Sequence, residues 1–191
     1  MFKICRNVGL LFFSLLFMNA INAETNIDHN NTQWPTTLSS YQQQHELKVV
    51  GNAVYSLLFW DLYKSQLLTS SGQYSQLSSH DDLIYKIEYL KDVSAVDLVE
   101  YTIEQWQHLA INEQQYKDYL PQLTAIWPNI KAGDSLALVV QNNSSAFYYN
   151  GELLGAMTGE HFAILFLDIW LSKNTSEPKL RAQLLGRTVN D

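Results

Sequence analysis

Phe147–Gly186 has the sequence FYYNGELLGAMTGEHFAILFLDIWLSKNTSEPKLRAQLLG, which reads as a strand, a turn, a second strand and two helices. Its first part has the most regular pattern. The apolar runs Ala146–Tyr149 and Glu152–Gly155 flank Asn150-Gly151, a pair of residues that accepts the positive φ angles of a tight hairpin turn. We therefore expect a β-hairpin at this position.

The remainder of Phe147–Gly186 predicts two helices. Thr158 is placed to cap the first, and the apolar side chains of this helix cover most of its circumference, as is typical of a buried helix. Those apolar positions are Phe162, Ile164, Leu165, Phe166, Ile169 and Trp170. A break at 174–177 precedes the second helix, in which Pro178 fits the first turn and Gly186 follows the last.

The chain before this block predicts more strands. The expected runs are 47–50, 53–59, 61–68, 83–90 and 136–141. Leu83–Leu90 alternates most clearly, so we expect its aromatic face, with Tyr85 and Tyr89, to be buried. Asn142–Ser145 should turn the last of these strands back onto the strand at 147–149.

Helices are expected in the middle of the chain. Ser94 and Asp97 have the spacing of a capping box, and an amphipathic helix should follow them. Pro121 would interrupt a further helical segment, which we split into 113–119 and 121–126. With strands first and helices in the middle and at the end, the order of elements predicts an α+β fold, in which an antiparallel β-sheet has its helices packed on one face.

The N-terminal segment is typical of a secretory signal peptide. Lys3 and Arg6 precede the apolar run Val8–Met18, which is shorter than the roughly 20 residues that span a bilayer. We expect cleavage after Ala23 and a periplasmic or secreted mature protein, and the alternative is an uncleaved membrane anchor. Cys5 precedes the apolar run, so it cannot be a lipoprotein acceptor.

The remaining chain is long enough for one domain with its own core. We divide the protein into a signal peptide (1–23), a flexible polar leader (24–44), a folded domain (45–187) and a tail (188–191). Without the signal peptide, 10 Lys and Arg stand against 19 Asp and Glu, a net charge of −9. This charge argues against nucleic acid as a partner.

Motifs for the common kinds of catalysis and metal binding are lacking in the sequence. The five histidines are scattered, without a local pair that could begin a metal site. There is no G-x-S-x-G elbow, P-loop or G-x-G-x-x-G motif. We therefore expect no metal and no cofactor, and we assign no catalytic residue.

Aromatic residues on the early strands and the amphipathic helix are better candidates for a functional site. They are Tyr55, Trp60, Tyr63, Tyr101 and Trp106. One interpretation is ordinary core, since aromatic side chains dominate protein cores. The other is a ligand pocket with largely apolar walls, in which tyrosine hydroxyls orient a polar head group.

Four further phrases accompany the hairpin and its two helices. They are LKVVG at 47–51, FWDLY at 59–63, YLKDVS at 89–94 and IWPNIKAGD at 126–134. Together with Phe147–Gly186 they resemble the chalcone isomerase-like family, in the form carried by secreted bacterial proteins, over about residues 45–187. The resemblance implies the open-faced β-sandwich of that family.

The resemblance also bears on chemistry. Plant chalcone isomerases close a flavanone ring with an arginine, two threonines, a tyrosine and an asparagine. By the resemblance, the corresponding positions here are Tyr55 for the arginine, and Asp61 or Leu62 and Ile169 for the two threonines. The tyrosine and the asparagine, which come from the helical region, correspond to the positions of Tyr101 and Thr102. The arginine and threonine positions do not match, so no catalytic residue carries over. Related plastid proteins bind fatty acids through that arginine and a tyrosine, and losing the arginine costs a carboxylate about 1.5–3 kcal/mol.

We therefore expect a non-catalytic, chalcone isomerase-like domain that binds a small apolar or amphipathic, fatty-acid-like molecule in a cleft between sheet and helices. Two alternatives stay open. One is an isomerase of the intramolecular lyase type on a non-flavonoid substrate, with hydroxyls such as those of Tyr55 or Tyr63 as general acids. The other is a structural or partner-binding periplasmic protein without a ligand.

Overall fold

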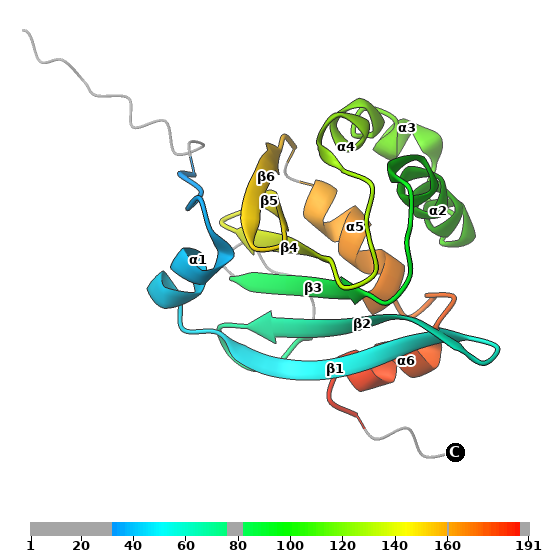
Figure 1. Cartoon of the computed structure of the whole chain (residues 1–191), viewed down its shortest axis with the longest axis horizontal. Coiled ribbons are helices and arrows are strands. Elements are labelled where there is room, and N and C mark those ends of the chain that lie inside the picture. Colours follow the sequence, from blue (N-terminus) through cyan, green and yellow to red (C-terminus); the bar gives the residue numbers. More distant parts are fainter. Residues whose placement is uncertain (1–31, 76–81, 160, 188–191) are drawn as a thin grey trace, which may run out of the picture.

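The computed structural model describes residues 32–75, 82–159 and 161–187. Within these residues, six strands form one antiparallel sheet, and each strand pairs with the strand that follows it in the sequence (Figure 1). The strands are β1 (Lys48–Leu57), β2 (Trp60–Thr69), β3 (Leu83–Tyr89), β4 (Ser135–Gln141), β5 (Ser144–Tyr149) and β6 (Glu152–Met157). The hairpins predicted at Asn142–Ser145 and Asn150-Gly151 are both present. The expected signal peptide at 1–23 and the expected tail at 188–191 lie outside the described residues.

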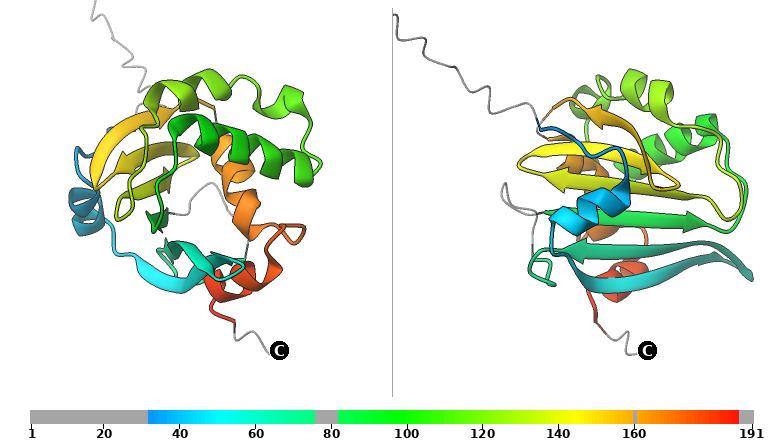
Figure 2. Two further views of the ribbon diagram at one scale, coloured as in Figure 1. Left: turned by 45° about the vertical axis from the view of Figure 1, so that its right-hand side comes forward. Right: turned by 60° about the vertical axis from the view of Figure 1, so that its left-hand side comes forward.

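Six helices accompany the sheet in the described part of the chain. They are α1 (Leu38–Gln44), α2 (Ala95–His108), α3 (Glu113–Tyr116), α4 (Leu120–Ile126), α5 (Phe162–Leu171) and α6 (Pro178–Leu184). Helices α2 to α5 lie together over one face of the sheet, α6 lies beside β1, and α1 lies on the opposite face (Figures 1 and 2). The fold is therefore the expected α+β arrangement, with one main helical layer. None of the described helices has the length and apolar character needed to cross a membrane.

The sheet separates two cores. The larger core lies between the sheet and α5, where Phe162 and Phe166 pack against Phe147 of β5 with ring centroids 5.9 and 5.3 Å apart. Helix α5 is buried around most of its circumference, as its apolar pattern predicted. The second core lies under α1 and includes Ile84 of β3, which has no exposed surface. The start of β3 is therefore buried on both faces, whereas its alternating pattern predicted one.

Helix α1 shows that the prediction of a flexible leader over 24–44 was wrong for the part that the structure describes. The Thr37 side chain accepts a hydrogen bond from the Ser40 amide at 3.1 Å and thereby caps the helix. Tyr41 has no exposed surface, and its ring stacks on that of His45 with centroids 4.2 Å apart. A seven-residue helix has a weak sequence signal because contacts with the sheet supply most of its stability.

Two local predictions also differ from the structure. Thr158 does not cap α5, because its hydroxyl and its amide both donate to the side-chain oxygen of Gln122, at 2.9 and 3.0 Å. Thr158 thus ties the end of β6 to α4. The strands expected at 47–50 and 53–59 are one strand, β1, with a register shift next to Gly51.

Gly51 marks the closest approach of β1 and α6. A Cβ atom at this position would overlap the carbonyl oxygens of Gln183 and Leu184 at the end of α6. The missing side chain therefore lets the helix end rest directly on the backbone of the strand. This contact fixes α6 at the edge of the sheet.

Candidate ligand-binding site

A cavity of about 460 Å³ lies between the main helical layer and the β1–β4 part of the sheet. Its walls come from these strands, from the loop after β3, from α2 and α5, and from the segment before α6. Apolar lining residues include Leu62, Leu98, Leu136, Phe166 and Ile169. The volume and the apolar walls are typical of sites for small organic ligands.

Three tyrosines from neighbouring strands line one wall of the cavity. Tyr55 of β1 lies opposite Tyr63 of β2, which lies opposite Tyr89 of β3. The ring centroids are 5.1 Å apart for Tyr55 and Tyr63 and 6.2 Å apart for Tyr63 and Tyr89. Residues directly opposite each other in antiparallel strands point to the same face, so the sheet register brings these three rings together.

The tyrosine hydroxyls of this wall are neutral at physiological pH. Burial raises the pKa of Tyr63 and that of Tyr89 well above the ordinary tyrosine value. Burial, with a smaller contribution from the Glu177 carboxylate, also raises the pKa of Tyr55. A protonated phenol both donates and accepts hydrogen bonds, so the wall can orient an uncharged polar group such as a hydroxyl or a carbonyl.

The charged side chains that line the cavity are mostly acidic. Asp92, Glu104 and Glu177 contribute carboxylates, and Lys91 is the one cationic residue among the described residues of the lining. Asp92 is neutralised by an ion pair with Lys131 at 2.8 Å. Elsewhere, too, the described residues bring together no group of three or more His, Cys, Asp or Glu side chains that could hold a metal ion.

Two polar side chains of the lining, those of Trp127 and Ser176, differ in their hydrogen bonding. Trp127 lines the cavity, and its buried indole N–H has no hydrogen-bond partner within the described part of the chain. The Ser176 hydroxyl donates to the Gln105 side-chain oxygen at 2.7 Å, which joins the segment before α6 to α2. A buried donor without a partner is costly, so a ligand oxygen that reached Trp127 would be stabilised there.

The structure divides the five aromatic residues that the sequence predicted for a pocket. Tyr55, Tyr63 and Tyr101 line the cavity. Trp106 belongs to the core, because it is fully buried and donates from Nε1 to a backbone carbonyl of α5 at 2.8 Å. Trp60 lies at the end of the β1–β2 hairpin and is 63% exposed. Tyr101 and Trp106 are five positions apart on α2, so they face different directions.

Tyr89, Trp127 and Trp170 also line the cavity, although no sequence pattern predicted them as site residues. Tyr89 was expected on a buried strand face and Trp170 in a buried helix, which is where the structure places them. The missing information was the pairing of β2 with β3, which sets Tyr89 beside Tyr63. The available signal was the alternation of Leu83–Leu90, which placed Tyr89 on the buried face of its strand.

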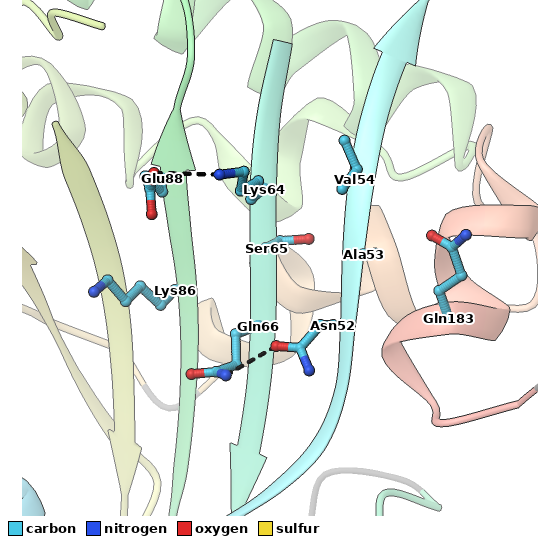
Figure 3. A pocket seen from close by; sticks show the side chains of 9 residues that line it. All are labelled: Asn52, Ala53, Val54, Lys64, Ser65, Gln66, Lys86, Glu88 and Gln183. Atoms are coloured by element: carbon cyan, nitrogen blue, oxygen red, sulfur yellow. Dashed lines mark hydrogen bonds and ion pairs between the residues drawn. The ribbon is translucent and has the colours of Figure 1, made fainter. Parts of the chain in front are cut away.

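A second hollow, of about 470 Å³, lies on the other face of the first strands, and most of the residues that line it are polar (Figure 3). Lys64 pairs with Glu88 at 3.8 Å, and the Gln66 side chain donates to that of Asn52 at 2.8 Å. Gln183 of α6 lies at its edge. Such cross-strand pairs are typical of a solvated sheet face, so we assign no site to this hollow.

Comparison with known protein families matches residues 28–186 to the family described as chalcone isomerase-like. The chain belongs to the chalcone isomerase-like family. The resemblance drawn from its sequence phrases is therefore confirmed. A protein of Haemophilus influenzae that is described as uncharacterized is 25% identical over 142 residues, which cover 74% of this chain and 69% of that protein.

This chalcone isomerase-like protein is also similar to a solved structure, that of a fatty-acid binding protein from Arabidopsis thaliana. The TM-score is 0.58 and the sequence identity is 11%, and the similarity covers 80% of this chain and 90% of the Arabidopsis chain. At this low identity the structural similarity shows a shared fold alone. That fold agrees with the antiparallel sheet and helical layer described above.

Proposed function

We propose that this protein is a non-catalytic binding protein that holds a small apolar or amphipathic molecule of fatty-acyl character. The observation that carries the proposal is the cavity of about 460 Å³, in which apolar walls surround one row of protonated tyrosine hydroxyls. This combination suits a ligand with an apolar body and one polar end. The Arabidopsis relative, described as a fatty-acid binding protein, supports the same class of ligand.

Each part of the ligand has a matching part of the cavity. The apolar body would contact Leu98, Leu136 and Phe166, and its removal from water would provide most of the binding free energy. The polar end would form hydrogen bonds with the hydroxyls of Tyr55 and Tyr63. These contacts require no covalent chemistry.

The tyrosine pKa values favour binding over the isomerase alternative. A general acid or base works best when its pKa lies near the working pH. The pKa values of Tyr55, Tyr63 and Tyr89 are all raised, which moves them further from neutrality. We therefore favour the binding function over the isomerase alternative.

We further propose that the protein binds its ligand in the periplasm or outside the cell, after cleavage behind Ala23. The support is the sequence of 1–23, with two basic residues, an apolar run and the small residue Ala23 directly before the cleavage point. N-terminal sequencing of the protein from a periplasmic extract should start at Glu24. Recovery of the intact N-terminus in the membrane fraction would contradict this proposal.

A titration of the purified protein tests the binding function. A medium-chain fatty alcohol and a panel of apolar dyes should bind saturably in isothermal titration calorimetry. Leu62→Trp, which fills part of the cavity, should weaken binding at least about tenfold, or about 1.4 kcal/mol. Val54→Trp on the opposite face of β1 is the matched control and should leave affinity unchanged.

Native mass spectrometry of the protein from its own periplasm provides an independent measurement. We expect a co-purifying adduct of lipid-like mass that the Leu62→Trp variant lacks. If fatty acids, fatty alcohols and dyes all fail to bind the unmodified protein, or if the two tryptophan variants lose affinity equally, the proposed function is wrong.

A further inference from the structure

The β1–β2 hairpin ends in four consecutive apolar side chains that are exposed to solvent. Their exposed fractions are 55% for Leu57, 85% for Leu58, 96% for Phe59 and 63% for Trp60. We call Leu57–Trp60 the hairpin tip. Figure 1 shows this hairpin projecting beyond the end of β3 at the right of the molecule. Large apolar side chains in this position contribute little to the core.

The geometry of the β1–β2 turn does not explain the apolar residues of the hairpin tip. Leu58 and Phe59 form the two-residue connection, and Leu58 has a φ of 56°, which bulky side chains rarely adopt. The β5–β6 hairpin solves the same problem with Asn150-Gly151, residues that suit such a turn. The residues of the hairpin tip are therefore unfavourable both for the turn and for exposure to water. This combination indicates that the tip is buried against the surface of another molecule or assembly.

We propose that the hairpin tip inserts into the interfacial region of a lipid bilayer. Trp60 lies at the base of the tip, and the Nζ atom of Lys91 is 4.8 Å from the centre of the Trp60 ring. Tryptophan is typical of the headgroup level of membranes, where a neighbouring lysine can extend its ammonium group toward lipid phosphates. Leu58 and Phe59 then reach the boundary of the acyl chains.

The narrow shape of the tip favours a bilayer over a protein partner. Directly behind the tip, the Ser56 hydroxyl donates to the Asp61 carboxylate at 2.6 Å, and both residues are exposed. The run of consecutive exposed apolar side chains therefore ends after four residues. A stable protein interface buries about 800 Å² on each partner. Shallow insertion into a bilayer requires only a few apolar side chains.

The hairpin tip is continuous with the cavity. Leu57 belongs to the tip and also lines the cavity, next to Tyr55 in β1 and close to Leu62 in β2. Insertion would therefore bring this side of the cavity to the membrane surface. An amphiphile could then pass between bilayer and cavity with little exposure to water. This passage rests on the proposed binding function, whereas insertion of the tip does not.

The charge of the protein predicts which membranes it prefers. The chain after residue 23 has a net charge of −9, and Glu104 and Glu177 line the cavity that adjoins the tip. Anionic lipids would repel these charges, so binding must come from apolar insertion. We expect stronger binding to phosphatidylcholine vesicles than to phosphatidylglycerol vesicles, with a difference that salt reduces.

Vesicle co-sedimentation of the purified protein tests the proposal. The double variant Leu58→Asn, Phe59→Gly has the turn residues of the β5–β6 hairpin, so it removes apolar surface while the turn is kept. It should lower partition onto phosphatidylcholine vesicles at least about tenfold. Val96→Ser changes a 65% exposed apolar residue on α2 and should alter partition less than about twofold.

Brominated lipids report the depth of the tip. They should quench tryptophan fluorescence of the protein, and Trp60→Phe should remove most of that quenching, because Trp60 is the tryptophan of the tip and is 63% exposed, whereas Trp106 and Trp127 are buried. Unchanged partition of the double variant would overturn the proposal. So would binding that requires anionic lipid, or capture of a protein partner by the tip while vesicles are not bound.

A vesicle-free titration with a soluble medium-chain alcohol separates this proposal from the cavity function. The double variant should retain alcohol binding while it loses vesicle binding, which would support both proposals. If the unmodified protein binds vesicles through the tip but binds no alcohol, the cavity function is wrong and the tip proposal holds. If it binds alcohol but no vesicles, the tip proposal is wrong.

Discussion

The indole Nε1 of Trp170 donates a hydrogen bond to the hydroxyl oxygen of Tyr63 across 2.9 Å. Trp170 also packs on Tyr85 of β3, with ring centroids 4.6 Å apart. The central helix α5 thus holds a tyrosine of the cavity wall in one orientation while its other side chains fill the core. This link couples the geometry of the cavity to the stability of the fold.

Tyr63→Phe tests this link. It leaves the Trp170 N–H without its acceptor, so we expect a loss of about 1–3 kcal/mol in the free energy of unfolding, measured with urea. Tyr55→Phe, at the less buried neighbouring position, should cost less than about 1 kcal/mol. The double variant Tyr63→Phe, Trp170→Phe should lose less than the sum of its single variants. Additive losses would show that the hydrogen bond is unimportant.

Glu177→Gln should change which head groups bind. The Glu177 carboxylate lines the cavity, so it repels a ligand that carries a carboxylate of its own. We expect the variant to bind a fatty acid about threefold to tenfold more tightly and the matched fatty alcohol with unchanged affinity, by calorimetry. Glu88→Gln on the outer sheet face is the control and should affect neither ligand.

Gly51→Ala should destabilise the protein through α6. The new Cβ would overlap two backbone carbonyls at the end of that helix, so helix and strand must separate, at a cost above about 2 kcal/mol. Gly155→Ala is the matched strand control, because its Cβ would meet only a side-chain methyl of Ile126 at 3.3 Å. Thermal unfolding should show a much smaller change for this control. Equal effects would mean that the α6 contact can relax.

Alkaline pH should lower stability through the tyrosines of the cavity wall. The pKa values of Tyr63 and Tyr89 are raised in the folded protein, whereas an unfolded chain has the ordinary value of 10.0. Their contribution is therefore complete below about pH 10 and is lost as the pH rises from there toward the folded pKa values. Unfolding measured against pH should show this fall, and Tyr89→Phe should reduce its slope. A flat profile above pH 10 would contradict the assigned burial.

Trp106→Ala should act on the fold and leave the cavity site intact. Its side chain is fully buried and stacks on Tyr116 at 4.9 Å, so truncation should cost about 3–5 kcal/mol of unfolding free energy. Tyr101→Ala removes a lining residue that is 56% exposed, so it should weaken ligand binding with little loss of stability. If Trp106→Ala instead weakened binding and left stability unchanged, Trp106 would be a residue of the site.

The sequence alone determined the elements whose signals are local. Asn150-Gly151 predicted its hairpin, and the Ser94–Asp97 cap is present, with the Asp97 amide donating to the Ser94 hydroxyl at 3.1 Å. The apolar circumference of 162–171 predicted a buried helix. Each of these features depends on residues a few positions apart, whose interactions are largely independent of the rest of the chain.

Only the tertiary structure decided which residues form the site. Pairing of three strands placed Tyr63 between Tyr55 and Tyr89, and the orientation of α2 turned Tyr101 to the cavity and Trp106 to the core. Aromatic side chains suit cores and pockets equally well, so their identity does not reveal which they join. Contacts between residues far apart in the chain make that choice, because they set strand register and helix rotation.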